Sequence, residues 1–148
     1  MTTASNAEIR LRNQQMLARI RSQEPQPHRE GRYALRVMTV AGRSSGKPRA
    51  VPIALMQHDG AHYVCSPDRH RDWVQNLLKA GHCVVETDDH PAREASLVED
   101  ITGATAVARY LSQLPRVSDE WPITGSTPPE QVLPHMRQIA VFRLDFAV

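Results

Sequence analysis

Six short segments of the chain alternate apolar and polar residues or are rich in β-branched and aromatic types, a pattern typical of half-buried β-strands. The segments are Tyr33–Val40, Ala50–Gln57, Ala61–Ser66, His82–Thr87, Ala92–Glu99 and Ile139–Phe146. Two turn signals, His58-Asp-Gly60 and Asp88-Asp-His-Pro91, predict hairpins within this set. Because the apolar faces need a common interior, the segments predict one mostly antiparallel sheet that closes into a barrel.

Three stretches change to a helical period. They are Ala7–Gln23, Arg69–Ala80 and Thr102–Leu114. The first has a thin apolar stripe among arginines, the second is followed by Gly81 as a stop signal, and the third ends before Pro115. The stretch from Pro115 to Pro134 is rich in Pro, Ser and Thr, a composition typical of loops. The fold class is therefore α+β: a small split β-barrel of about six strands with two or three helices.

The length of 148 residues suits one domain with one real core. The prolines of Glu24-Pro-Gln-Pro-His28 break the first helix, because proline lacks a donor and restricts the residue before it. We therefore expect residues 1–30 to form an N-terminal helix and a proline-containing linker. Residues 31–148 are expected to form the barrel domain.

Composition excludes several classes of protein. A formal charge of +2 is too mild to indicate nucleic acid as a partner. The seven histidines show no HxxH or HExxH spacing, so no metal site is expected. Cys65 and Cys83 are far from any CxxC spacing and indicate a reduced, cytoplasmic protein. No apolar run approaches the roughly 20 residues of a membrane span, so no integral membrane association is expected.

The segment with the most evident chemistry is the basic loop Gly42–Arg49, GRSSGKPR, between two predicted strands. It combines three cations, two hydroxyls and two glycines, so that backbone N–H groups and long side chains could converge on an anion. It is not a phosphate-binding P-loop, because three residues rather than four separate its glycines. A solvated hairpin tip is the alternative interpretation.

The run from Val37 to Pro52, VMTVAGRSSGKPRAVP, resembles the start of the deazaflavin-dependent nitroreductase or quinone reductase family, whose pattern is a strand, GRxSGxxR and a second strand. Trp73-Val-Gln-Asn76-Leu77 is similar to the W-x-x-N-L helix of that family, and Val141-Phe-Arg-Leu144 resembles its closing strand. Together the matches span roughly Tyr33 to Phe146.

This resemblance implies a split β-barrel that binds coenzyme F420, an 8-hydroxy-5-deazaflavin, or in relatives a flavin such as FMN. Hydride would pass from the reduced cofactor to a quinone, a nitro compound or an activated alkene. Carried over by position, five residues of the loop would face the phosphate and acidic tail of the cofactor: Arg43, Ser44, Ser45, Lys47 and Arg49. Simple turn formation is the alternative role for the two serines.

The chain departs from the family in the loop Cys65–Asp72, which is short and has no glycine. Ser66 and Arg69 of this loop are further candidate contacts to the cofactor. Trp73 is another, although a tryptophan one turn before Leu77 is more often a core anchor than a ring-stacking platform. Asn76 is expected to tie its helix to a loop backbone.

The proton donor is not identified by the pattern. Tyr33, Tyr110 and His70 are candidates by residue type alone. Cys65 and Cys83 are expected to be small buried residues rather than nucleophiles.

The departure at Cys65–Asp72 leaves an alternative function from another class. A split barrel without cofactor could be a ligand-binding protein, or an isomerase or cyclase of secondary metabolism. A third interpretation, a non-catalytic protein acting through the arginine-rich first helix, is disfavoured by the narrow apolar stripe. We expect a homodimer acting on a small molecule, since split barrels often pair and an open barrel leaves strand edges that a partner can cover.

Overall fold

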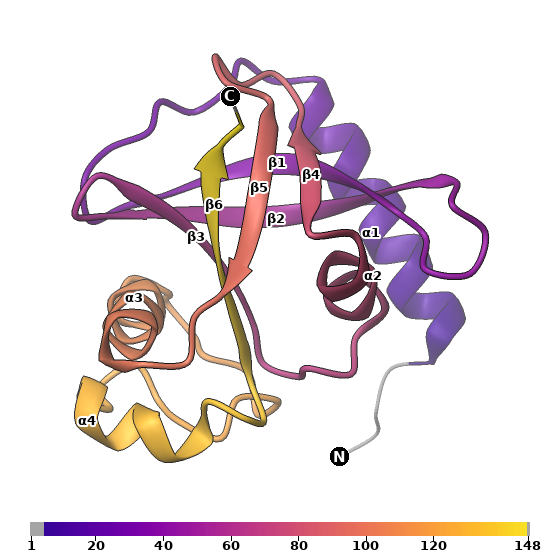
Figure 1. Ribbon diagram of the computed structural model, residues 1–148. Coiled ribbons are helices and arrows are strands. Elements are labelled where there is room, and N and C mark those ends of the chain that lie inside the picture. The colour runs from indigo at the N-terminus through magenta and orange to yellow at the C-terminus, as the bar shows by residue number, and fades with distance from the viewer. Residues whose placement is uncertain (1–4, 148) are drawn as a thin grey trace.

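The computed structural model describes residues 5–147 and shows the predicted barrel (Figure 1). All six strands pair antiparallel, in the closed order β1-β2-β3-β6-β5-β4. The strands are β1 (Tyr33–Ala41), β2 (Pro48–His58), β3 (Ala61–Ser66), β4 (His82–Val85), β5 (Ala92–Leu97) and β6 (Ala140–Phe146). The fold class predicted from the sequence is therefore confirmed. Residues 1–4 of the expected N-terminal segment and residue 148 lie outside the described range.

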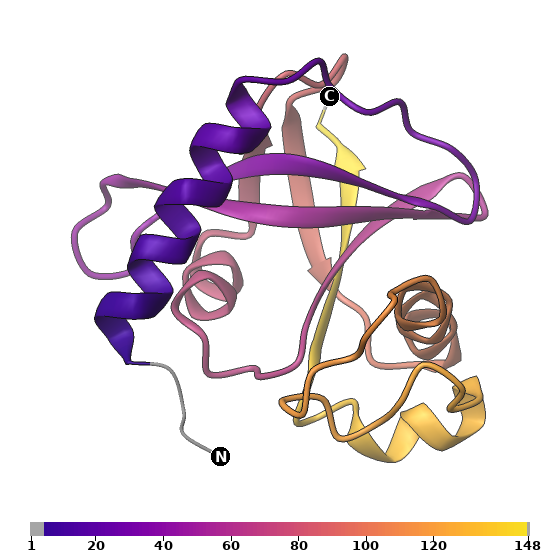
Figure 2. The same ribbon diagram turned by 180° about the vertical axis from the view of Figure 1, so that it is seen from behind.

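The helices cover the barrel from three directions. They are α1 (Asn6–Arg21), α2 (Asp72–Ala80), α3 (Ile101–Ser112) and the short α4 (Pro129–Val132), which a single 3₁₀ turn at Leu133–His135 continues. Figure 2 shows α1 lying across the outer face of β1 and β2, with α3 and α4 at another side. Arg21 at the end of α1 pairs with Glu86 after β4, at 2.7 Å, and so fastens the helix to the barrel.

All three predicted helix starts differ from the observed ones, and the first helix begins at Asn6 rather than Ala7. The second helix begins at Asp72 rather than Arg69, because Pro67 and the turn around Asp68 occupy the preceding residues: the Asp68 carboxylate accepts from the backbone N–H of His70 at 2.8 Å. The third begins at Ile101, because Asp100 is its N-cap and accepts from the backbone N–H of Thr102 at 3.1 Å.

The first half of strand β6 is buried on both faces and separates two hydrophobic clusters. Ala140, Phe142 and Leu144 face the barrel interior. Val141 and the preceding Ile139 pack instead under α3 and α4. The barrel therefore has one core inside and a second core between its outer wall and these helices.

The barrel wall is split between β2 and β3. The two strands have 11 and 6 residues, yet they pair only next to their turn, from Met56 with Tyr63 to His58 with Ala61. Beyond these pairs the strands diverge, and the edge of β2 toward β3 has no ladder partner within the described part of the chain. Pro52 lies on this stretch, where its missing N–H costs no ladder hydrogen bond.

Candidate functional site

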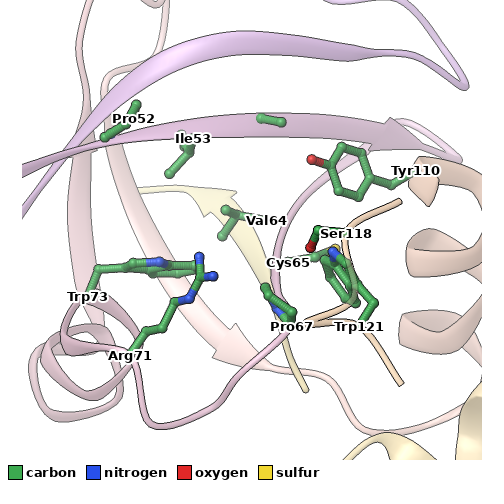
Figure 3. A pocket seen from close by; sticks show the side chains of 11 residues that line it. Pro52, Ile53, Val64, Cys65, Pro67, Arg71, Trp73, Tyr110, Ser118 and Trp121 are labelled. Carbon is green, nitrogen blue, oxygen red and sulfur yellow. The ribbon is translucent and has the colours of Figure 1, made fainter. Parts of the chain in front are cut away.

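The split between β2 and β3 opens into a cavity of about 230 Å³. Figure 3 shows its lining side chains between the two strands. The lining residues are Pro52, Ile53, Ala54, Val64, Cys65, Pro67, Arg71, Trp73, Tyr110, Ser118 and Trp121. The cavity is slightly smaller than the roughly 300–1,000 Å³ of sites that enclose a whole small molecule. It therefore suits one flat ring system rather than an entire dinucleotide-sized cofactor.

Aromatic side chains from three elements form the walls. Trp73 of α2 and Trp121, from the loop after α3, lie on opposite sides in Figure 3. Trp73 also packs against Phe142 of the barrel core, with ring centroids 6.2 Å apart. Trp73 therefore packs against the core, the role that the sequence favours, and it also lines the cavity.

Tyr110 of α3 brings a phenolic hydroxyl to the cavity. Its hydroxyl points into the space between β2 and β3 in Figure 3 and makes no hydrogen bond to any of residues 5–147. Burial raises the pKa of Tyr110 to about 12. Cys65 beside it is half-buried, and desolvation raises the pKa of its thiol to about 12. Both groups are therefore neutral at ordinary pH, and the thiol is a poor nucleophile.

An ion pair lies at the edge of the cavity. Arg71, the residue before α2, pairs with Glu120 in the loop that carries Trp121. Both side chains are largely exposed, so the pair adds little stability by itself. It does connect the two segments that carry the facing tryptophans.

The basic loop is an ordered connection between β1 and β2. The backbone N–H of Gly42 donates to the Lys47 carbonyl at 2.8 Å, and that of Gly46 donates to the Gly42 carbonyl at 2.8 Å. Gly46 has φ +71°, which favours glycine. The Ser45 hydroxyl accepts from the Lys47 N–H at 3.1 Å, so Ser45 forms the turn, whereas Ser44 is exposed at its tip.

Arg43 ties this loop to α2. Its backbone N–H and its guanidinium both donate to the Asn76 side-chain oxygen, at 3.0 and 2.9 Å, and the guanidinium also contacts the Asp72 carboxylate at 3.1 Å. Lys79 of the same helix donates to the Arg43 carbonyl at 2.6 Å. Asn76 thus connects its helix to a loop backbone as predicted, and the loop is placed beside the helix that carries Trp73.

The two remaining cations of the loop face solvent. Lys47 and Arg49 are exposed and form no ion pair with any of residues 5–147. Arg49 and Pro52 are three residues apart on β2, which at about 3.3 Å per residue places Arg49 roughly 10 Å along the strand from the cavity, and Lys47 lies farther away, in the loop before β2. An uncompensated positive loop and an aromatic cavity therefore share one strand.

The remaining residues that the sequence predicted for the site do not line the cavity. The Ser66 hydroxyl is buried and donates to the Asp68 carbonyl at 2.8 Å. Arg69 donates to the carbonyls of Ile139 and Met136, at the start of β6, and His70 is exposed and does not line the cavity. Tyr33 lies behind the cavity, with its ring edge-on to that of Tyr110 at 5.5 Å.

Sequence reasoning missed Trp121 and the β2 stretch around Pro52 as cavity residues. The available signal was Trp121 itself, a tryptophan in a Pro- and Ser-rich loop. Exposing its large apolar ring to solvent costs more free energy than exposing the other residues of that loop.

A second polar cluster closes the opposite end of the barrel around Arg93, which is 1% exposed. Its guanidinium pairs with Asp88 and donates to the His62 Nδ1 at 2.9 Å, while His28 contacts the other Asp88 oxygen at 2.9 Å. His28, His62 and Asp88 lie close enough to share a cation. However, the Arg93 guanidinium occupies this space and donates to His62 Nδ1, so that lone pair is not available to a metal. The cluster is an ion-pair network that fastens the linker to the barrel.

Burial, followed by the neighbouring His28 and Arg93 side chains, lowers the pKa of His62 to about 4, so it is neutral. Burial alone would raise the pKa of Asp88, but the hydrogen bond from His28 and the charge of Arg93 hold it below its ordinary value.

The sequence that forms this arrangement matches a known protein family. The family model of F420H(2)-dependent quinone reductases matches residues 10–123, which include most of α1, the basic loop, α2, α3 and Trp121. The chain belongs to this family. The protein is accordingly an F420-dependent oxidoreductase, and the predicted family, activity class and cofactor are confirmed.

The fold is also similar to solved structures at low sequence identity. One is a Listeria innocua protein named after pyridoxamine 5'-phosphate oxidase, at 16% identity over 88% of this chain and 90% of that chain, with a TM-score of 0.48. The General Stress Protein 26 of Bacillus anthracis str. Sterne has 12% identity over 88% and 86%, with a TM-score of 0.47. An F420 reductase has 14% identity over 80% and 90%, with a TM-score of 0.45. None of the curated proteins compared with the chain matches it.

The residues of the split fit F420. The cavity offers aromatic and apolar walls to a flat ring, and Lys47 and Arg49 offer unpaired positive charge to an anionic tail. Arg43 is engaged with Asn76 and Asp72, so its contribution is to hold the loop in place. No helix among residues 5–147 is long and apolar enough to cross a membrane.

Proposed function

We propose that the protein reduces a neutral, flat acceptor such as a quinone, with the deazaflavin ring held in the split of the barrel and the anionic tail on the basic loop. The observation that carries the proposal is the continuity of the chain from the exposed cations, Lys47 just before β2 and Arg49 on β2, to the aromatic cavity at Pro52. Bound F420H2 supplies the hydride.

The side chains of this chain would bind, orient and exclude water. Lys47 and Arg49 would form charge-assisted contacts with the phosphate and acidic tail. Trp73 and Trp121, on opposite sides of the cavity, would restrict a flat ring and keep water from the reacting face.

Tyr110 would hold the proton that the acceptor needs. Its hydroxyl lies in the cavity with no hydrogen-bond partner among residues 5–147, and burial raises its pKa to about 12, so the proton is present throughout the neutral range. A quinone oxygen that gains negative charge as hydride arrives is a suitable acceptor of this hydrogen bond. A nitro compound or an activated alkene would use the same contact.

We also propose that the protein is a cytoplasmic homodimer. The unpaired half of β2 and the exposed apolar side chains Leu78 and Val84 support a second copy as partner. The free thiols of Cys65 and Cys83 support a reducing compartment. Light scattering at micromolar concentration tests the dimer, and a purely monomeric protein would contradict it.

A titration of the purified protein with F420 and, separately, with FMN tests the proposed site. Because Trp73 and Trp121 line the cavity, F420 should quench tryptophan fluorescence in a saturable manner, and FMN should bind more weakly. Saturable F420 binding that leaves tryptophan emission unchanged would place the ring elsewhere. Absence of affinity for both would instead favour the cofactor-independent ligand-binding protein, isomerase or cyclase.

A further inference from the structure

A second pocket, outside the split, lies between the N-terminal linker and α3. It has a volume of about 430 Å³ and is lined by Gln26, Pro27, Arg29, Arg32, Tyr33 and Gln113. Figures 1 and 2 both show the end of the linker passing beside α3 at this side of the barrel. The volume is within the roughly 300–1,000 Å³ of sites that hold small molecules, and it exceeds that of the catalytic cavity.

Hydrogen bonds fix both walls of this linker pocket. On the linker side, the Gln26 side chain accepts from the Leu35 N–H at 2.9 Å, and the Gly31 N–H donates to the Gln57 carbonyl at 2.8 Å. On the helix side, Gln113 donates to the Gly31 carbonyl at 2.8 Å. Both walls are thus joined at Gly31, and the pocket is a preformed feature of the fold rather than a gap beside a loose segment.

The charge of the linker pocket is positive and uncompensated. Arg29 and Arg32 line it, and Arg109 of α3 lies behind Gly31, donating to its carbonyl at 3.3 Å. None of the three arginines pairs with an acid among residues 5–147. The nearest acid in sequence, Glu30, is taken by the turn after β2, where it accepts from the N–H groups of Asp59 and Gly60.

The pocket also presents an aromatic surface. Tyr33 contributes to its lining, and Pro27 adds a second apolar ring. Guanidinium groups beside an aromatic ring match a ligand with an acidic group on a flat apolar body, because arginine binds carboxylate and phosphate through two parallel N–H donors.

We infer that the linker pocket is a binding site for a small aromatic anion, an arylcarboxylate or an aryl phosphate, separate from the F420 site. Arg29 and Arg32 bind the acidic group, and Tyr33 contacts the ring. The pocket is connected to the catalytic cavity through aromatic contacts: Tyr33 meets Tyr110 at 5.5 Å, and Tyr110 meets Trp121 at 6.5 Å. A ligand in the linker pocket therefore contacts Tyr33, whose ring packs against Tyr110, the proposed proton donor.

Calorimetric titration with naphthalene-2-carboxylate tests the inference, with the uncharged naphthalene-2-carboxamide as matched ligand. The carboxylate should bind at least about tenfold more tightly than the amide. The double variant Arg29→Ala/Arg32→Ala should lose at least about tenfold in affinity for the carboxylate, whereas Arg12→Ala, which removes an exposed arginine of α1, should not. Backbone NMR signals of Gly31, Tyr33 and Gln113 should shift on titration.

A second pair of variants separates the two sites. Lys47→Ala/Arg49→Ala should leave naphthalene-2-carboxylate binding unchanged, and saturating F420 should not displace the probe. Equal affinity for carboxylate and amide, insensitivity to the loss of Arg29 and Arg32, or displacement by F420 would each overturn the inference. The probe titration needs no cofactor, so a failure of the proposed F420 site would leave this result intact.

Discussion

Asn76 of α2 accepts two hydrogen bonds from Arg43, which lies 33 positions earlier in the chain. One amide oxygen thereby joins the W-x-x-N-L helix to the GRxSGxxR loop. The two sequence features that carried the family resemblance are in contact in the folded protein, and the contact positions the basic loop beside the cavity.

Replacement of Asn76 by alanine should lower the free energy of unfolding by about 1–3 kcal/mol, because the Arg43 donors lose a partly buried acceptor. F420 affinity should fall as well, since the loop loses its attachment to α2. Urea denaturation and F420 titration measure the two effects. Asn76→Asp keeps an oxygen facing Arg43 and serves as the control; a fully stable alanine variant would show that the contact is incidental.

Removal of the two solvent-facing cations in Lys47→Ala/Arg49→Ala should weaken F420 binding by about 1.5–3 kcal/mol per lost contact. The melting temperature should stay unchanged, because neither side chain is part of a core. For the wild type, affinity should fall as salt rises, since exposed charges are screened over about 10 Å at 0.1 M. Titrations of wild type and variant at low and high salt test this. Equal F420 affinities of the wild type and the variant would show that the loop is only a solvated turn.

Tyr110→Phe should lower kcat by about 10²–10⁴-fold with little change in the Kd of F420, because it removes a proton and not the ring. The high pKa of Tyr110 means that the wild-type rate should show no loss from its ionisation up to about pH 11. Steady-state kinetics across pH measure both effects. His70→Ala, outside the cavity, is the control, and a fully active phenylalanine variant would rule out Tyr110 as donor.

Acid should destabilise the barrel through His62. Its pKa is about 4 in the folded protein and about 6.5 in an unfolded chain, so between these values the unfolded state takes up a proton that the folded state does not. Stability should therefore fall as pH drops through this window, by about 1.4 kcal/mol for each unit between the two pKa values.

Urea denaturation at a series of pH values measures this loss. His62→Gln should flatten the decline between about pH 6.5 and 4, because glutamine does not titrate. His70→Gln, at an exposed position, should retain the wild-type slope. A decline that persists unchanged in His62→Gln would assign it to other groups of the network.

The strands could be predicted because alternation is a local signal, and β3 was predicted at its observed bounds, Ala61–Ser66. The burial of the outer face of β6 was missed, because Ile139 and Val141 are buried by α3 and α4, and the alternation within the strand does not predict these contacts. Likewise α4 follows Pro128 in a Pro-, Ser- and Thr-rich stretch, where composition favours loops and only packing of Val132 into the second core favours a helix.

The site was predictable where the chemistry is local and not where it depends on distant partners. The cations of the basic loop, Trp73 and Tyr110 are evident from residue type. The partners of Arg69 are not, because they lie 67 and 70 positions later, and they direct this arginine toward β6. The ion pair of Arg71 with Glu120 spans 49 positions and has no sequence signal.

The split between β2 and β3 also bears on how long the protein survives in a cell. Strands of 11 and 6 residues that share three residue pairs leave a stretch of wall whose cohesion depends on what fills the cavity. A ligand that binds only the folded chain adds about 2.7 kcal/mol of stability at a concentration 100 times its Kd. Chains made when cofactor is scarce would open more often and be degraded sooner, so the amount of enzyme would follow the supply of its own cofactor without any dedicated regulator.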